Sequence, residues 1–187
     1  ERYGMTETNM NASNPLDGER KAGSVGKALK GTSIRITSIG ENNLSDINEP
    51  GMIEIKGPNV FTGYLNKPGK TKEAFTDDEY FITGDMGYFD KEGYLFISGR
   101  NKDLIISGGY NVYPKEIEDI INQFDGIIES AVFGLSDDDL GEIPTAAIVA
   151  NENNFNLDDL KKFIQENLAR YKVPKKYFLI SELPRNV

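Results

Sequence analysis

Residues that could bind a nucleotide stand together at the start of the sequence, in the stretch ERYGMTETNM (residues 1–10). The ring of Tyr3 can stack on a base, and Gly4 lets the backbone come close to a ligand. The hydroxyl of Thr6 can form a hydrogen bond to a phosphate, and the carboxylate of Glu7 can hold a metal ion. These residue types at this spacing indicate a nucleotide site.

Two later stretches could complete such a site. Asp85 ends the stretch YFITGD, where a carboxylate held by a tight turn could accept hydrogen bonds from two vicinal sugar hydroxyls. An ordinary turn or capping aspartate is the alternative, and it is the more frequent meaning of such a triplet alone. Gly108 and Gly109 precede an aromatic residue in SGGYNVYP and would let a ligand approach the backbone, although a plain glycine turn accounts for them equally well.

The composition excludes several classes of chemistry. The 187 residues include neither cysteine nor histidine, so disulfides, thiolate nucleophiles, Cys/His zinc sites and a histidine-based triad are impossible within them. The net charge of −9 argues against a nucleic-acid surface. No apolar run approaches the roughly 18 residues of a membrane helix. We expect no nucleic-acid or membrane partner, and a location in the cytoplasm or an organelle matrix.

The first part of the chain, to about residue 101, is predicted to be rich in strands, because apolar and polar residues alternate there. Residues 8–31 are rich in Asn, Gly and Pro and are predicted to form a loop. A short polar helix is expected at 70–78. The predicted strands are 32–39, 52–57, 80–85 and 93–100.

From residue 102 onward the pattern changes to that of a small α+β unit. Apolar residues recur at helical spacing within 115–124 and again within 156–171, where Asn156 is the expected N-cap. The apolar residues of the two predicted helix faces are Ile117, Ile120, Ile121, Phe124, Leu157, Leu160, Ile164 and Leu168. The strands expected here are 129–135, 145–150 and 177–181.

Five stretches, taken in order, resemble the motifs of the adenylate-forming enzymes, the AMP-dependent synthetases and ligases that include the acyl-CoA synthetases. They are YGMTE, GMIEIKGPNVFTGY, TGD, GRNKDLIISGGYNVYP and ARYKVP. The opening ERYGMTETNMN and the stretch GGYNVYPKE are most similar to the malonyl-CoA synthetases. The resemblance implies an α+β fold, in which 1–101 is the β-rich C-terminal part of a large AMP-binding domain and 102–187 is a small, mobile C-terminal domain.

The resemblance also implies roles for matching residues. The tyrosine of the first motif would lie against the adenine ring, the threonine would bond the phosphate, and the glutamate would hold Mg²⁺. Asp85 would accept the ribose hydroxyls, with Arg100 beside them. The residues implied to bind ATP, AMP or Mg²⁺ are Tyr3, Gly4, Met5, Thr6, Glu7, Asp85 and Arg100.

The implied activity has two steps, in which a small carboxylic acid is first adenylated by ATP, with release of pyrophosphate, and then transferred to coenzyme A. Lys102 matches the hinge about which the small domain turns between the steps, and Gly108 and Gly109 would line the pantetheine path. Malonate or a related acid is the expected substrate, and Arg2 could pair with its second carboxylate. An ordinary surface arginine, or one paired within its own domain, is an equal alternative for Arg2. The oligomeric state is left open.

Two functional elements of the resembled family have no counterpart in the 187 residues. Its Ser/Thr/Gly-rich phosphate loop lies upstream of YGMTE, and its adenylation lysine follows a PRN segment, whereas this sequence ends at LPRNV. We therefore expect a C-terminal fragment of a ligase that is inactive by itself. An adenylation domain that loads a carrier protein and a non-catalytic binding module are alternatives that the sequence leaves open.

Overall fold

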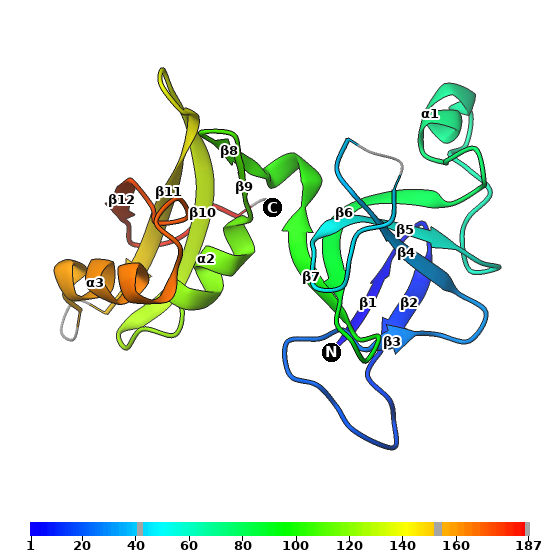
Figure 1. The fold of residues 1–187 in the computed structure, drawn as a ribbon, viewed down its shortest axis with the longest axis horizontal. Coiled ribbons are helices and arrows are strands. Elements are labelled where there is room, and N and C mark those ends of the chain that lie inside the picture. Colours follow the sequence, from blue (N-terminus) through cyan, green and yellow to red (C-terminus); the bar gives the residue numbers. More distant parts are fainter. Residues whose placement is uncertain (41–42, 152–154, 186–187) are drawn as a thin grey trace. The chain divides into compact units, whose positions relative to one another are not determined.

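The computed structural model describes residues 1–40, 43–151 and 155–185 (Figure 1). The chain divides into two compact units, Glu1–Asn101 and Lys102–Val187, and each is described by itself. Residues 186–187, which complete the LPRNV stretch, lie outside the described residues. No helix in the described ranges is long and apolar enough to cross a membrane.

The first unit consists of two antiparallel sheets with the strand orders β1-β2-β3 and β4-β5-β6-β7 (Figure 1). Its elements are β1 (Arg2–Met5), β2 (Asn9–Ser13), β3 (Lys27–Ala28), β4 (Ser33–Thr37), β5 (Gly51–Lys56), α1 (Pro68–Glu73), β6 (Phe81–Phe89) and β7 (Leu95–Arg100). Alternating residues of β4 and β5 supply much of one buried cluster, to which β1 contributes Tyr3. The buried members are Tyr3, Ala12, Ile36, Ile53, Ile55 and Leu95.

The prediction of a loop over 8–31 is wrong in part, because β2 and β3 lie within it. β2 does not show the usual apolar alternation, since its fully buried Asn11 is polar. The side chain of Asn11 is satisfied internally: it donates to Thr8 Oγ1 at 2.7 Å and accepts from Asn59 Nδ2 at 3.0 Å. Because this buried position is occupied by a hydrogen-bonded polar residue, the alternation of apolar and polar residues did not indicate a strand here.

Some boundaries also differ from the predictions. The helix expected at 70–78 is α1, which begins at Pro68, a residue suited to the first turn, and ends at Glu73. The strand expected to end at Asp85 continues to Phe89. Gly84 adopts a φ of +75°, and the pairing of β6 with β7 shifts register between Met86 and Gly87. The TGD triplet is thus an irregular part of a continuing strand rather than its end.

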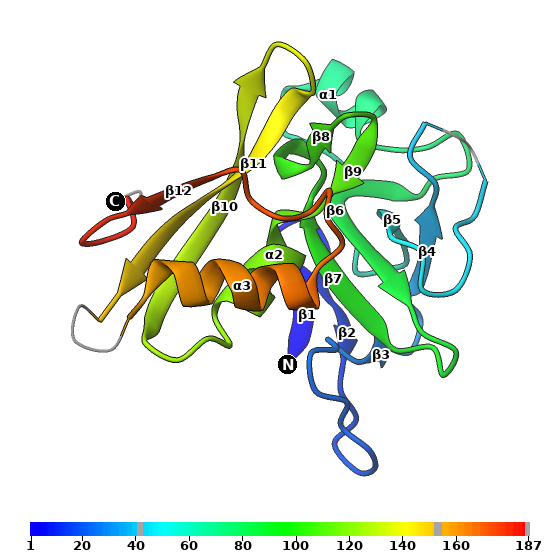
Figure 2. The same ribbon diagram turned by 60° about the vertical axis from the view of Figure 1, so that its left-hand side comes forward.

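The second unit is a five-stranded sheet with the order β10-β11-β8-β9, in which β12 pairs with β11 in parallel (Figure 2). Its elements are β8 (Ile105–Ser107), β9 (Tyr110–Val112), α2 (Pro114–Ile121), β10 (Ile127–Asp137), β11 (Gly141–Ala150), α3 (Leu157–Asn167) and β12 (Lys176–Leu179). A single 3₁₀ turn, Asn101–Asp103, precedes it. The prediction of an α+β fold is confirmed.

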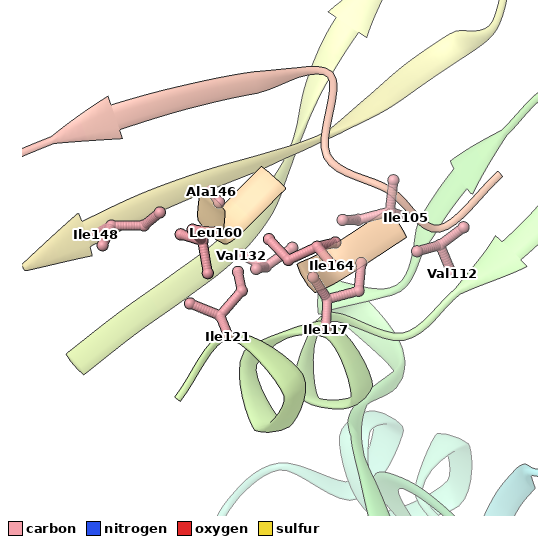
Figure 3. Packing of buried hydrophobic residues seen from close by; sticks show 9 residues of the cluster. All are labelled: Ile105, Val112, Ile117, Ile121, Val132, Ala146, Ile148, Leu160 and Ile164. Atoms are coloured by element: carbon pink, nitrogen blue, oxygen red, sulfur yellow. The ribbon is translucent and has the colours of Figure 1, made fainter. Parts of the chain in front are cut away.

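Both helices of the second unit pack on the same face of the β10–β11 pair. Ile117 and Ile121 of α2 and Leu160 and Ile164 of α3 are fully buried. Figure 3 shows these side chains converging with those of the strands in one apolar cluster, whose buried members are Ile105, Val112, Ile117, Ile121, Val132, Ala146, Ile148, Leu160 and Ile164. The predicted helix faces are confirmed at these four positions.

The N-cap prediction for α3 is also confirmed. The side chain of Asn156 accepts hydrogen bonds from the N–H groups of Asp158 and Asp159, at 2.8 and 3.2 Å. The helix ends at Asn167, earlier than residue 171.

Candidate active site

A buried carboxylate forms the centre of the candidate site in the first unit. Tyr3 of β1 donates a hydrogen bond from its phenol to Oδ2 of Asp85 in β6, at 2.6 Å. Nε of Arg100, the cross-strand partner of Asp85 in β7, lies 2.8 Å from the other carboxylate oxygen, Oδ1. The structure therefore brings together three of the residues that the sequence singled out.

The backbone around Asp85 is held by Thr83. The threonine hydroxyl donates to the carbonyl oxygen of Ile53 at 2.8 Å and accepts from the N–H of Asp85 at 3.0 Å. Thr83 and Asp85 are both buried, and Gly84 between them takes up the left-handed conformation that favours glycine. The TGD triplet thus works as a rigid support for the carboxylate within a strand, and not as the tight turn that was predicted.

The phenol of Tyr3 is a permanent hydrogen-bond donor. Burial, together with the hydrogen bond to the Asp85 carboxylate, raises the pKa of Tyr3 well above its ordinary value. The hydroxyl consequently stays protonated near neutral pH. The ring itself is 7% exposed and belongs to the buried cluster of the first unit.

Thr6 and Glu7 lie in the turn between β1 and β2, which is anchored by the segment 57–64. Asn59 donates from Nδ2 to the carbonyl oxygen of Thr8 at 2.7 Å. The N–H of Phe61 donates to the carbonyl oxygen of Glu7 at 2.8 Å. These contacts hold the turn that carries the two candidate ligands.

Sequence reasoning missed this anchoring segment. The stretch GPNVFTGY was part of the resemblance, but no residue in it received a role. The phenol of Tyr64 donates to Oε1 of Glu7 at 3.2 Å, and burial and this hydrogen bond raise the pKa of Tyr64. The sequence signal that could have indicated a role was an asparagine, Asn59, and an aromatic residue, Tyr64, close to glycines. Only the fold shows that these two residues contact residues 6–8.

The turn between β1 and β2 supplies too few ligands to hold Mg²⁺ by itself, and it fits the ion only together with phosphate groups. The described ranges hold no group of three or more Asp, Glu, His or Cys side chains that could enclose a metal ion. Glu7 is partly exposed and uses one carboxylate oxygen for Tyr64, which leaves further lone pairs available. One carboxylate combined with substrate phosphates and water is a usual environment for Mg²⁺.

Arg2 is exposed, whereas Tyr3, the next residue of β1, is buried. Arg2 lines a hollow of about 850 Å³ together with Arg20, Lys27 and Lys30. Arg20 donates to the carbonyl oxygens of Pro15 and Leu16, at 3.2 and 3.4 Å. Four cationic residues and one acidic residue, Glu1, line this hollow, so its net charge favours an anion.

The remaining candidates belong to the second unit. Gly108 and Gly109 form the two-residue loop of the β8–β9 hairpin, because Ser107 pairs with Tyr110. Their φ angles of +57° and +83° explain the glycine pair, since such a loop requires positive φ at both positions. Lys102 lies in the 3₁₀ turn Asn101–Asp103. The hinge and pantetheine roles stay predictions.

Comparison with known families identifies the chain. The AMP-binding enzyme family model matches residues 1–65, and that of the AMP-binding enzyme C-terminal domain matches residues 116–187. The chain belongs to the AMP-binding enzyme family. The resemblance inferred from the motifs is thereby confirmed, as is the adenylate-forming enzyme fold.

Individual relatives of this AMP-binding chain are CoA ligases. The 2-succinylbenzoate–CoA ligase of Geobacillus sp. (strain WCH70) is 41% identical and aligns with 98% of the chain and 37% of its own length. The malonate–CoA ligase of Arabidopsis thaliana is 41% identical and aligns with the whole chain and 32% of its own length. The chain thus spans about a third of the length of these relatives.

Two solved structures are also similar to this chain in sequence and fold. ATP-bound MatB from Rhodopseudomonas palustris is 50% identical, with a TM-score of 0.94, over 99% of this chain and 37% of that one. The o-succinylbenzoate coenzyme A synthetase MenE from Bacillus subtilis, in complex with ATP and magnesium ion, is 37% identical. Its TM-score is 0.87, over 100% of this AMP-binding chain and 38% of that chain.

Proposed function

We propose that the protein to which this chain belongs is an AMP-forming acid–CoA ligase. In the first step a carboxylate oxygen of the acid attacks the α-phosphorus of ATP, and pyrophosphate leaves. In the second step the thiol sulfur of coenzyme A attacks the acyl carbon, and AMP leaves with the electron pair of the broken carbon–oxygen bond. Chemistry of this kind depends on positioning and charge stabilisation, which is consistent with a chain that lacks His and Cys.

The observation that carries this proposal is the buried carboxylate of Asp85. Oδ2 receives a hydrogen bond from the phenol of Tyr3, and Oδ1 forms an ion pair with Arg100. A carboxylate has about four acceptor positions, so one on each oxygen is left for a ligand. Two adjacent acceptors match the two vicinal hydroxyls of a ribose, which supports an ATP and AMP site here.

The turn between β1 and β2 would serve the phosphates. Thr6 is exposed and offers a hydroxyl, and Glu7 offers a carboxylate whose position is supported by Tyr64. Mg²⁺, bound by Glu7 and the phosphates, would neutralise charge on the phosphate oxygens. Gly4 and Met5 connect this turn to Tyr3, and so would place the phosphate end and the ribose end of one nucleotide along β1.

We further propose that the acid is a dicarboxylate such as malonate. Malonate and 2-succinylbenzoate, which name the two relatives above, each carry two carboxylates. The carboxylate that does not react needs a cationic partner if the acyl pocket excludes water. Arg2 adjoins the nucleotide motif and lines a hollow with three other cationic side chains, and so is our candidate for that partner.

The activity can be tested with the full-length protein. Malonate-dependent exchange of radioactive pyrophosphate into ATP reports the first step, and mass spectrometry of malonyl-CoA reports the second. Exchange without thioester formation would favour an adenylating enzyme that loads a carrier protein. A protein that binds ATP but catalyses neither step with any acid would contradict the proposal and favour a binding module.

Asp85→Ala provides the residue-level test in the same assay. It would remove up to two charge-assisted hydrogen bonds to the ribose, each worth about 1.5–3 kcal/mol, so ATP affinity and exchange rate should fall at least about tenfold. Asp17→Ala, in the exposed loop before β3, is the matched control. A loss of less than about twofold for Asp85→Ala would show that Asp85 does not bind the ribose.

A further inference from the structure

We infer that Tyr3 is a positioning residue for Asp85: the hydrogen bond from its phenol fixes the carboxylate in the orientation that receives the ribose hydroxyls. This inference rests on the proposed nucleotide function of Asp85. It assigns to Tyr3 a role in recognising the sugar, in addition to the contact with the adenine ring that the motif resemblance implies.

Two contacts hold the carboxylate of Asp85 in place. A carboxylate at the end of a short side chain can rotate about its final bond unless its oxygens are held. The oxygen Oδ2 is held by the Tyr3 phenol at 2.6 Å, a distance typical of a strong O–H···O⁻ hydrogen bond. Oδ1 is held by Arg100 at 2.8 Å. The hydrogen bond on Oδ2 and the ion pair at Oδ1 together hold the carboxylate in one orientation, so its remaining acceptor positions point in defined directions.

The two partners of the carboxylate are not equivalent. The side chain of Arg100 is 51% exposed, so water competes for its guanidinium and its long chain has rotational freedom. Tyr3 is buried among apolar residues of the first unit and has only two rotatable side-chain bonds. We therefore attribute the orientation of Asp85 chiefly to Tyr3, while Arg100 supplies charge.

The side chain of Tyr3 is buried, whereas its hydroxyl reaches the candidate site. Tyr3 as a whole residue is 7% exposed, so most of its side chain is packed within the first unit. Its hydroxyl, in contrast, reaches the one buried carboxylate that the proposed function requires, 82 residues along the chain. The raised pKa of Tyr3 keeps this hydroxyl protonated near neutral pH, where it can donate.

The test compares ATP with 2′,3′-dideoxy-ATP, which lacks both ribose hydroxyls. The full-length protein and its Tyr3→Phe variant are titrated with each nucleotide by isothermal calorimetry. Tyr3→Phe keeps the ring and removes only the donor. We expect its ATP affinity to fall about three- to tenfold, as for the loss of one hydrogen bond that supports a charged group, and its dideoxy-ATP affinity to stay within about twofold.

A double variant adds a second readout. Tyr3→Phe acts through Asp85, so Asp85→Asn and Tyr3→Phe/Asp85→Asn should bind ATP equally within about twofold. Thermal unfolding of each variant shows that the comparison is made between folded proteins. If Tyr3→Phe does not fold, 3-fluorotyrosine at position 3 replaces it. Fluorine makes the phenol more acidic and therefore a stronger donor, so this variant should keep its discrimination between the two nucleotides. A loss of that discrimination would overturn the inference.

The outcomes separate the inference from the proposed function. If the wild type does not discriminate between the two nucleotides, the ribose role of Asp85 is wrong, and the inference falls with it. If the wild type discriminates through Asp85 but Tyr3→Phe retains that discrimination in full, only the inference is overturned. Equal losses for both nucleotides would also overturn it, because they indicate contact with the base or a general structural effect.

Discussion

Tyr64 donates a hydrogen bond to Glu7 across 57 positions of sequence, with 3.2 Å between Oη and Oε1. The ring of Tyr64 also meets that of Phe61 edge to face, with 4.8 Å between centroids. The segment 57–64 therefore holds both the backbone of the β1–β2 turn and the side chain of its carboxylate.

The first prediction follows from this contact. Tyr64→Phe keeps the ring and removes the donor that orients Glu7, so the apparent affinity for Mg²⁺ should fall about two- to fivefold, the range for one partly exposed hydrogen bond. Initial rates of pyrophosphate exchange at varied Mg²⁺ and saturating ATP measure it. Tyr80→Phe is the matched control, because that phenol bonds Ser33 instead. Unchanged or tighter Mg²⁺ binding would contradict a supporting role for Tyr64.

Arg2→Met tests the acid substrate. If Arg2 pairs with the second carboxylate of malonate, the variant should lose about 2–5 kcal/mol in kcat/KM toward malonate, as for a stranded buried charge, and far less toward acetate. Lys91→Met, which removes an exposed cation outside the hollow, is the control. A wild type that prefers acetate or longer monoacids would discard the malonate proposal and leave the ligase proposal standing.

Lys102→Pro tests the proposed hinge. Proline would fix φ near −65° at residue 102 and disfavour the helical conformation of Asn101, which would restrict rotation at this position. Adenylation and thioester formation, assayed separately, should then change unequally. Lys102→Ala removes the charge without the restriction and serves as control. Equal losses in both half-reactions would mark Lys102 as a structural residue and not as a pivot.

Residues 102–187 should fold by themselves. All nine buried residues of the second cluster lie between Ile105 and Ile164, so this unit contains its own core. A unit this small is expected to be only marginally stable. Well-dispersed amide signals in an NMR spectrum would support the prediction, and Ile164→Ala should remove about 2–5 kcal/mol and collapse that dispersion. A collapsed spectrum without any substitution would place the boundary elsewhere.

Glu118 should make stability depend on pH. Burial raises the pKa of Glu118, although its carboxylate accepts a 2.8 Å hydrogen bond from the N–H of Val132. The folded state thus holds the proton more tightly than the unfolded state does. The contribution is present below the unfolded pKa and is lost as the pH rises through the folded pKa.

Glu118→Gln keeps the acceptor and removes the charge. The variant should melt a few degrees above the wild type near pH 7 and at about the same temperature near pH 4, where both side chains are neutral. Far-UV circular dichroism of residues 102–187, in which the described helices are α2 and α3, measures the transition. Glu166→Gln on exposed α3 surface is the control. A difference that does not vary with pH would contradict the assignment to Glu118.

Local sequence determined the features that depend on near neighbours. The spacing of Ile117, Ile121, Leu160 and Ile164 predicted two helix faces, because helical periodicity brings such residues onto one side. Asn156 predicted the start of α3, because its side chain accepts hydrogen bonds from N–H groups only two and three positions away. The motifs also identified the family, because their types and order could be compared directly.

Only the tertiary structure decided how the candidate site is assembled. The Tyr3–Asp85 bond spans 82 positions and the Asn59–Thr8 bond spans 51, and no periodicity links residues so far apart. β2 escaped prediction because it buries a polar residue, Asn11, whose partners are Thr8 in the preceding turn and Asn59, 48 positions away. A sequence lists donors and acceptors, but which of them meet depends on strand pairing and on local irregularities such as the positive φ of Gly84, the residue before Asp85.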